Sequence, residues 1–156
     1  MDRKKGLSHV GATAGEGCVF CDIAAGRAPA LVVAENDLAL AIRDIQPLAD
    51  GHSRVLPRRH VPWWDEMEED ETEAVFTLAR HTAGKIRGAF APDCVTMYAR
   101  GRRVPHTHIF LVPTFASDPL DRLFNALEGF QEQAASLADL SDPEAMRAAF
   151  DKLMEK

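Results

Sequence analysis

The sequence contains no apolar run close to the roughly 20 residues that a helix needs to span a bilayer. A broad basic surface is also missing, because the net charge is −6 and the 18 Lys and Arg residues are scattered apart from two short clusters, Arg58-Arg59 and Arg100-Gly101-Arg102-Arg103. Duplex nucleic acid and anionic membranes both need a wide basic face. We therefore expect neither as a partner, whereas two short basic clusters suit a small anion.

Cysteine is scarce, and two of the three cysteines stand together in Cys18-Val-Phe-Cys21. Three cysteines do not make a disulfide framework, so the pair is a metal knuckle, a redox motif or an accident of spacing. The basic start Arg3-Lys4-Lys5 is followed by a polar, glycine-rich stretch that cannot serve as the apolar region of a signal peptide. We therefore expect a cytoplasmic protein.

A chain of 156 residues, 46% of them hydrophobic, can bury one core but is too short for two ordinary domains. Residues 1–17 are rich in small residues without any period, which predicts a flexible N-terminal tail. We expect the folded domain over residues 18–115. Amphipathic patterns after Pro113 predict a C-terminal helical extension over residues 116–156.

Local patterns predict the individual elements. Apolar and β-branched stretches predict strands at residues 31–34, 38–42, 53–56, 94–98 and 107–112, the last two as an antiparallel pair. Residues 23–26 suit a short helical turn, and apolar residues at three- and four-residue steps predict a long helix over about 70–90. In the extension, Ser141-Asp-Pro-Glu144 has the pattern of a capping box that opens the second of two helices.

Two histidines stand two apart in His106-Thr107-His108, and a strand would place both on one face, close enough to share a site. Alternatively, one is a buried structural histidine and the other lies at a solvated edge. Cys18 and Cys21 can supply half of a tetrahedral zinc shell, with His60 and His106 as candidates for the other half. Two buried thiols that bind nothing remain an alternative, and a redox role lacks the parallel βαβ unit that carries such motifs.

Four separated motifs, taken in order, resemble the bacterial branch of the histidine-triad (HIT) superfamily. They are Cys18-Val-Phe-Cys21, Arg43-Asp-Ile-Gln-Pro-Leu-Ala-Asp-Gly-His52, Pro57-Arg-Arg-His60 and Gly101-Arg-Arg-Val-Pro-His-Thr-His108. The resemblance covers roughly residues 18–113, about two thirds of the chain. It implies an α+β fold, with an antiparallel sheet of about five strands and packed helices, which usually pairs as a homodimer.

The resemblance also implies the chemistry. In zinc-containing relatives the matching positions hold a structural zinc ion closed to substrate, and these positions here are Cys18, Cys21, His60 and His106. His108 matches the family nucleophile. A neutral imidazole there attacks the α-phosphate of a nucleoside phosphoramidate or dinucleoside polyphosphate and forms a covalent nucleotidyl-histidine. A backbone carbonyl fixes its tautomer in relatives.

Four further residues match positions around the substrate. His52 matches a histidine on the phosphate side, which we count with the catalytic residues, and Asp44 matches a carboxylate that binds the ribose hydroxyls. Ile23 and Ile45 match apolar walls near the base. For Asp44, the alternative is a loop carboxylate that caps a turn.

The sequence departs from the family pattern at three places. Phe110 replaces the third triad histidine, and the loss of one preorganised donor commonly costs about 10²–10³ in rate. Tyr98-Ala-Arg-Gly101 shortens a loop that is normally rich in asparagine. Arg102 and Arg103 replace neutral polar residues, and they either hold a more highly charged phosphate through bidentate contacts or are solvated loop residues.

Trp63-Trp64 could stack on a base, but we favour packing in the core or at a dimer interface. Cys94 is predicted to be a buried strand thiol. The leading hypothesis is an enzyme that acts at the α-phosphate of a small nucleotide through His108, aided by Arg102 or Arg103. The alternatives are a HIT-fold nucleotide-binding protein with little turnover because of Phe110, and a zinc-stapled structural or interaction module whose C-terminal helices bind a partner.

Overall fold

The computed structural model describes residues 17–155, so the tail predicted over residues 1–17 lies outside the described residues except for Gly17. The chain divides between Phe115 and Ala116 into two compact units, the sheet unit before this point and the helical unit after it. Within residues 17–155, no helix is long and apolar enough to cross a bilayer.

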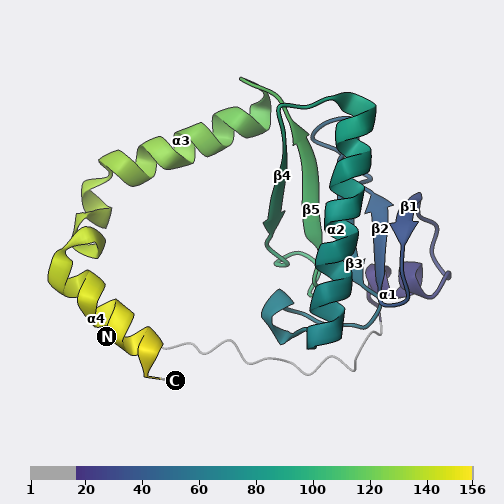
Figure 1. Ribbon diagram of the computed structural model, residues 1–156, viewed down its shortest axis with the longest axis horizontal. Coiled ribbons are helices and arrows are strands. Elements are labelled where there is room, and N and C mark those ends of the chain that lie inside the picture. The colour runs from purple at the N-terminus through teal and green to yellow at the C-terminus, as the bar shows by residue number, and fades with distance from the viewer. Residues whose placement is uncertain (1–16, 156) are drawn as a thin grey trace. The chain divides into compact units, whose positions relative to one another are not determined.

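The sheet unit is built on a five-stranded antiparallel sheet in the order β1-β2-β3-β5-β4 (Figure 1). Its strands are β1 (Val32–Glu35), β2 (Ala39–Arg43), β3 (Ser53–Pro57), β4 (Cys94–Ala99) and β5 (Ile109–Thr114). The predicted α+β fold and the antiparallel pairing of the last two strands are confirmed. However, β5 begins two residues later than predicted, because the amide of Thr107 donates to the carbonyl of Val61, at 2.6 Å, outside the sheet.

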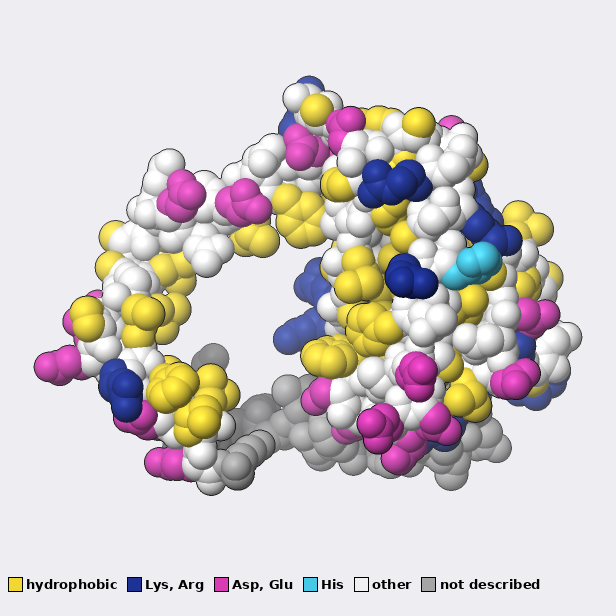
Figure 2. All heavy atoms as spheres, viewed as in Figure 1, with side chains coloured by type: hydrophobic (Ala, Val, Ile, Leu, Met, Phe, Trp, Pro, Cys, Tyr) yellow, Lys and Arg dark blue, Asp and Glu magenta, His cyan; other side chains and the backbone are white. Residues whose placement is uncertain are grey.

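One face of this sheet is covered by α2 (Glu69–Phe90), which follows the short 3-10 helix η1 (Trp64–Glu66) (Figure 1). Alternate strand residues such as Ala41, Val55 and Leu111 form a buried cluster with Val75 and Leu78 of the helix. The long helix predicted over about 70–90 is therefore confirmed. Acidic side chains gather at its N-terminal end (Figure 2), where their negative charge interacts favourably with the positive end of the helix dipole.

The opposite face receives α1 (Val19–Ala24), whose Phe20 is buried together with Cys18, Leu40, Ile42 and Leu56. Because successive strand residues point to opposite faces, β2 is buried on both sides by these two clusters. The predicted turn over residues 23–26 was wrong in position. The helix already begins at Val19, since the carbonyl of Cys18 accepts from the amide of Asp22 at 3.1 Å.

The helical unit consists of α3 (Pro119–Gln133), the 3-10 helix η2 (Ala135–Ser141) and α4 (Pro143–Met154). The predicted cap at Ser141 was wrong, because the side chain of Asp142 accepts from the amides of Glu144 and Ala145, each at 3.0 Å. Hydrophobic side chains are exposed along α3 and α4 (Figure 2), among them Leu123, Leu127, Phe130, Met146, Phe150 and Leu153.

Candidate functional site

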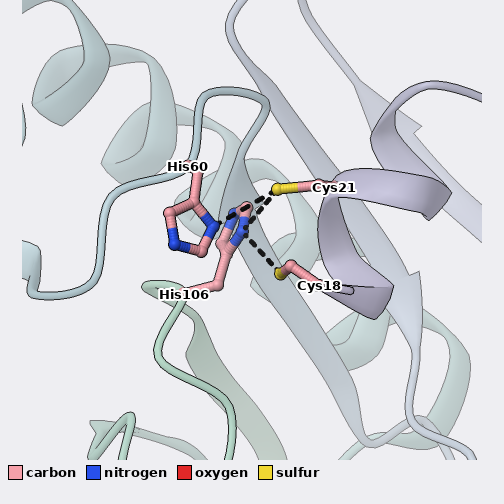
Figure 3. A group of neighbouring side chains, drawn as sticks. All are labelled: Cys18, Cys21, His60 and His106. Carbon is pink, nitrogen blue, oxygen red and sulfur yellow. Dashed lines mark hydrogen bonds between the residues drawn. The ribbon is translucent and has the colours of Figure 1, made fainter. Parts of the chain in front are cut away.

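Four side chains from three parts of the sheet unit converge on one point (Figure 3). Cys18 and Cys21 come from the start of α1, His60 from the loop after β3, and His106 from the bend before β5. Their ligand atoms all lie within 4.8 Å of one another. The structure thus brings together all four residues that the sequence nominates as metal ligands.

The distances between the sulfur and nitrogen atoms suit a tetrahedrally coordinated metal ion. The Sγ of Cys18 lies 3.4 Å from the Nδ1 of His106, and the Sγ of Cys21 lies 3.3 Å from the Nδ1 of His60 and 3.5 Å from that of His106. Zn–S bonds of about 2.3 Å and Zn–N bonds of about 2.1 Å at tetrahedral angles imply S···N distances of about 3.6 Å. The cluster could therefore close around a zinc-sized ion with small adjustments.

The surroundings of the cluster favour a cation. Nε2 of His106 donates to the carbonyl of Pro57 at 2.9 Å, which leaves Nδ1 as the free nitrogen that faces the cysteines. Burial, and next the hydrogen bond with Cys18, raises the pKa of Cys21 to about 11, while burial lowers the pKa of His106 to about 4. A bound cation would reverse the preference of the thiols for their protons and would use the neutral imidazole directly.

A cavity of about 390 Å³ opens on the sheet face that carries α1 and is lined by His108. Nδ1 of His108 donates to the backbone carbonyl of His106 at 2.7 Å, which fixes the tautomer and leaves the lone pair on Nε2. Burial lowers the pKa of His108, so the neutral form of this imidazole predominates at neutral pH. The other lining residues are Asp44, Gln46, Leu48, His52, Arg54, Tyr98, Phe110 and the loop residues 100–104.

The two triad histidines do not share one site. His106 belongs to the Cys-His cluster and His108 to the cavity, although Phe20 contacts both rings, with centroid distances of 5.6 Å and 5.0 Å. The expectation of a shared site was wrong because the chain bends at His106 before β5 begins. The two sites are adjacent, and the hydrogen bond between these residues connects them.

Phe110, at the position of the third triad histidine, lies in a row of side chains across three strands. Its register partners are Tyr98 on β4 and Arg54 on β3. The Tyr98 ring stacks on Phe110 with a centroid distance of 4.5 Å and an interplanar angle of 14°, and the Arg54 guanidinium lies 4.9 Å from the Phe110 centroid. The Phe110 and His108 rings pack at a steep angle of 68°, with their centroids 4.9 Å apart.

Asp44 and His52 lie deep in the same cavity. The Asp44 side chain has no exposed surface, forms an ion pair with Arg54, and accepts from the amide of Gln46 at 2.7 Å. Nε2 of His52 lies 3.4 Å from this carboxylate without making a hydrogen bond of good geometry, and Nδ1 accepts from the amide of Leu48 at 3.0 Å. Burial lowers the pKa of His52, so its ring is also neutral.

Arg54 is the site residue that the sequence analysis missed. It lies in the strand Ser53–Pro57, in which all the remaining residues are buried, and its side chain lines the cavity. The available signal was a charged residue within an apolar run, at a strand position whose side chain alternates with the core-facing Val55.

The apolar walls suggested by the sequence lie farther out. Ile23 is half-buried against the cluster around Phe20, whereas Ile45 is 92% exposed. Among the described residues that line the cavity, neither isoleucine is present. Arg102 and Arg103 are exposed loop residues at its rim.

A second, smaller cavity of about 130 Å³ is also lined by His108, together with Trp63, Trp64 and Gly101 among others. The tryptophans are 39% and 54% exposed, so the expectation of core packing was wrong, and a dimer interface stays a prediction. Cys94 is also exposed, contrary to prediction, because β4 is an edge strand of the sheet.

The sequence is similar to a known domain family and to several known proteins. A family model described as HIT domain matches residues 25–117. A HIT-like protein of Mycoplasma genitalium is 32% identical over 103 residues, which cover 63% of this chain and 73% of that protein. An adenylylsulfatase of Arabidopsis thaliana is 32% identical, and the match covers 66% of this chain and 55% of that protein. An adenosine 5'-monophosphoramidase of Schizosaccharomyces pombe is 29% identical, and the match covers 62% of this chain and 73% of that protein.

Solved structures share the fold. A member of the HIT family from Bacillus subtilis is 26% identical with a TM-score of 0.62, and the match covers 76% of this chain and 98% of that one. A zinc-bound histidine triad family protein from Mycobacterium smegmatis is 24% identical with a TM-score of 0.61, over 78% of this chain and 97% of that one. At 24% identity this second likeness speaks for the fold alone.

Proposed function

Because this chain belongs to the HIT domain family, we propose that it binds a small nucleotide in the cavity beside His108 and cleaves it at the α-phosphate. The observation that carries the proposal is the hydrogen bond from Nδ1 of His108 to the carbonyl of His106, which presents the lone pair of Nε2 to a cavity rimmed by arginines. The names of two relatives, an adenylylsulfatase and an adenosine 5'-monophosphoramidase, also describe substrates with an adenosine phosphate group.

The proposed reaction has two steps. Nε2 of His108 attacks the α-phosphorus of a nucleoside phosphoramidate or dinucleoside polyphosphate, while the bond to the amine or phosphate leaving group breaks and its electron pair departs with that group. Water then attacks the phosphorus of the nucleotidyl-histidine, releases the nucleoside monophosphate and restores His108. The carbonyl of His106 holds the imidazole through both steps and stabilises its positive charge.

The surrounding residues would bind and orient the substrate. Arg102 and Arg103 are free to hold phosphate oxygens at the rim, because a guanidinium fork matches two oxygens at once. His52 lines the same cavity, and a place for it on the phosphate side stays a prediction from the family pattern. A ribose contact by Asp44 stays a prediction, and it requires the carboxylate to exchange a contact, since both of its oxygens are engaged within the chain.

We propose that Cys18, Cys21, His60 and His106 hold one structural zinc ion. The ion would act as a cross-link between α1, the loop after β3 and the bend before β5, and it would have no position left for substrate. Within this cluster, Cys18 and Cys21 flank Phe20, which packs against His108. His106 provides the backbone carbonyl that fixes the His108 tautomer.

Two alternatives have observations in their favour. The phenyl ring of Phe110 offers no hydrogen-bond donor to a phosphate, which favours a nucleotide-binding protein with little turnover. The exposed apolar side chains of α3 and α4 favour an interaction module stapled by zinc.

Mass spectrometry of the intact protein tests the proposed function. Wild type and His108→Ala are quenched during incubation with adenosine phosphoramidate, and the proposal expects an adenylyl adduct on the wild type alone. Nucleotide binding without adduct or product would instead support the binding protein, and the absence of both binding and turnover would leave the interaction module.

A further inference from the structure

We propose that Arg54, from the neighbouring strand, makes the phosphate contact that a histidine at position 110 would make. The inference rests on the proposed function in one respect: it assumes that the cavity beside His108 takes a nucleotide phosphate. It assigns a role to a residue outside the sequence motifs described above.

Strand register places Arg54 at this point. Arg54 on β3 pairs directly with Phe110 on β5, and paired residues of antiparallel strands project from the same face of the sheet. Its guanidinium carbon lies 4.9 Å from the Phe110 centroid and 5.8 Å from the Phe20 centroid. Because both rings also contact His108, at 4.9 Å and 5.0 Å, the guanidinium and the imidazole lie against the same two rings.

The guanidinium has donors to spare. Among the described residues, its hydrogen bonding is limited to Nε, which donates to Asp44, so the two terminal NH₂ groups can bind an anion. The Arg54 side chain is 22% exposed and lines the cavity, while Asp44 is fully buried behind it. Asp44 therefore compensates the charge of Arg54 and holds its orientation, and the free edge of the planar fork matches two phosphate oxygens.

Phe110 suits this arrangement better than a histidine would. An aromatic face within about 6 Å of a guanidinium attracts it, whereas a protonated histidine at the same position would repel it. The stacked Tyr98 supports the ring from the side of β4. Phe110 thus packs against the Arg54 guanidinium. Arg54 supplies the hydrogen-bond donors that a phenylalanine at position 110 lacks.

The experiment compares wild type, Arg54→Gln and Arg54→Lys, with Arg58→Gln as the matched control. Arg58 is another partly exposed arginine with an acidic partner, Glu35, and it lies outside the cavity. AMP binding is measured by titration calorimetry, and the rate of adduct formation on His108 is measured by mass spectrometry with adenosine phosphoramidate. Circular dichroism and thermal melting establish that each variant is folded.

We expect Arg54→Gln to weaken AMP binding by roughly 10- to 100-fold, as for the loss of a charge-assisted contact. Adduct formation should slow by about 10²–10³-fold. The AMP affinity and adduct rate of Arg54→Lys should lie between those of wild type and Arg54→Gln, because an ammonium keeps the charge but not the bidentate fork. Arg58→Gln should match the wild type, and Phe110→His added to Arg54→Gln should recover at least about tenfold of the lost adduct rate.

The two proposals fail in different ways. Equal AMP affinity and adduct rate in wild type and a folded Arg54→Gln would overturn the role of Arg54 while leaving the enzyme intact. If wild type binds AMP without forming an adduct, and Arg54→Gln loses the binding, the proposed reaction fails and the role of Arg54 stands. Should Arg54→Gln unfold because Asp44 loses its partner, Arg54→Lys keeps the ion pair, and a wild-type affinity and adduct rate in that variant would overturn the bidentate contact.

Discussion

His108 donates from Nδ1 to the backbone carbonyl of His106 at 2.7 Å, and the side chain of His106 is itself part of the four-residue Cys-His cluster that could hold a metal ion. His106 therefore connects the two sites, because its side chain lies in the cluster and its backbone carbonyl accepts from His108. Through this bond, the position of Nε2 of His108, the proposed nucleophile, depends on how firmly the cluster holds His106.

Removal of a metal ligand should destabilise the sheet unit. We expect about one zinc ion per chain in the purified protein, and Cys21→Ser should lower both the zinc content and the melting temperature, because metal binding contributes directly to folding. The matched control is Cys94→Ser, since Cys94 is exposed on β4 and lies outside the cluster. A wild type without metal whose melting temperature equals that of Cys21→Ser would contradict the prediction.

The loop that carries Arg100, Arg102 and Arg103 turns at Gly101, whose φ of +66° lies in the left-handed region. An alanine there costs about 1–2 kcal/mol and would shift the loop to relieve the strain. We expect Gly101→Ala to weaken AMP binding, measured by calorimetry. Gly26→Ala is the control, because Gly26 has a similar φ of +72° and lies outside the cavity. Equal losses of affinity in the two variants would refute a role for the loop.

The ion pair between Arg59 and Glu71 should make stability depend on pH. Its hydrogen bonds, at 2.7 Å and 2.6 Å, are the main reason why the pKa of Glu71 lies below its ordinary value. A lowered pKa contributes stability that is present above the pKa of the unfolded state, about 4.3, and is lost as the pH falls through the folded value. Arg59→Gln should therefore destabilise the protein by about 1 kcal/mol at pH 7, and by less below pH 4.

Urea unfolding at several pH values measures this difference. Arg58→Gln again provides the comparison, because its partner Glu35 is largely exposed and such pairs contribute little. A difference between wild type and Arg59→Gln that stays constant from pH 7 to pH 3 would show that Glu71 is not the titrating partner.

The N-cap of α4 can be tested at single-residue level. The Asp142 side chain accepts from the amides of Glu144 and Ala145, whereas the Ser141 hydroxyl donates to the carbonyl of Ala138. Asp142→Ala should cost about 1 kcal/mol and speed hydrogen exchange at those two amides. Ser141→Ala should leave their exchange unchanged, and the reverse pattern would restore the cap that the sequence suggested.

The four cluster residues were nominated before the fold was known, because the Cys-x-x-Cys pair suggested half of a metal site and the resemblance to the HIT superfamily implied the other two ligands. Cys18 and Cys21 are separated by two residues on one turn, and the motif order nominated His60 and His106 to complete the set. The long helix and the five strands were equally predictable, since period and composition reflect burial on one or both faces. The proposed homodimer stays a prediction.

Other features depended on contacts that no local pattern contains. The sequence nominated Asp44, but only the pairing of β3 with β2 brings Arg54 beside Asp44, and only the pairing of β3 with β5 brings it against Phe110. Register between strands far apart in sequence is set by packing over the whole sheet. For the same reason the exposure of Cys94 followed from the place of β4 at the edge, and a sequence pattern for a strand does not say where in a sheet the strand will lie.

The sequence by itself therefore determined the kinds of chemistry present in this protein: two thiols, paired histidines and short basic clusters on an α+β chain. The tertiary structure decided which groups meet: it brought the four nominated ligand residues together and set Arg54 beside His108 in the cavity. The physical reason is that residue type and spacing act along the chain, whereas burial, strand register and charge compensation act across it.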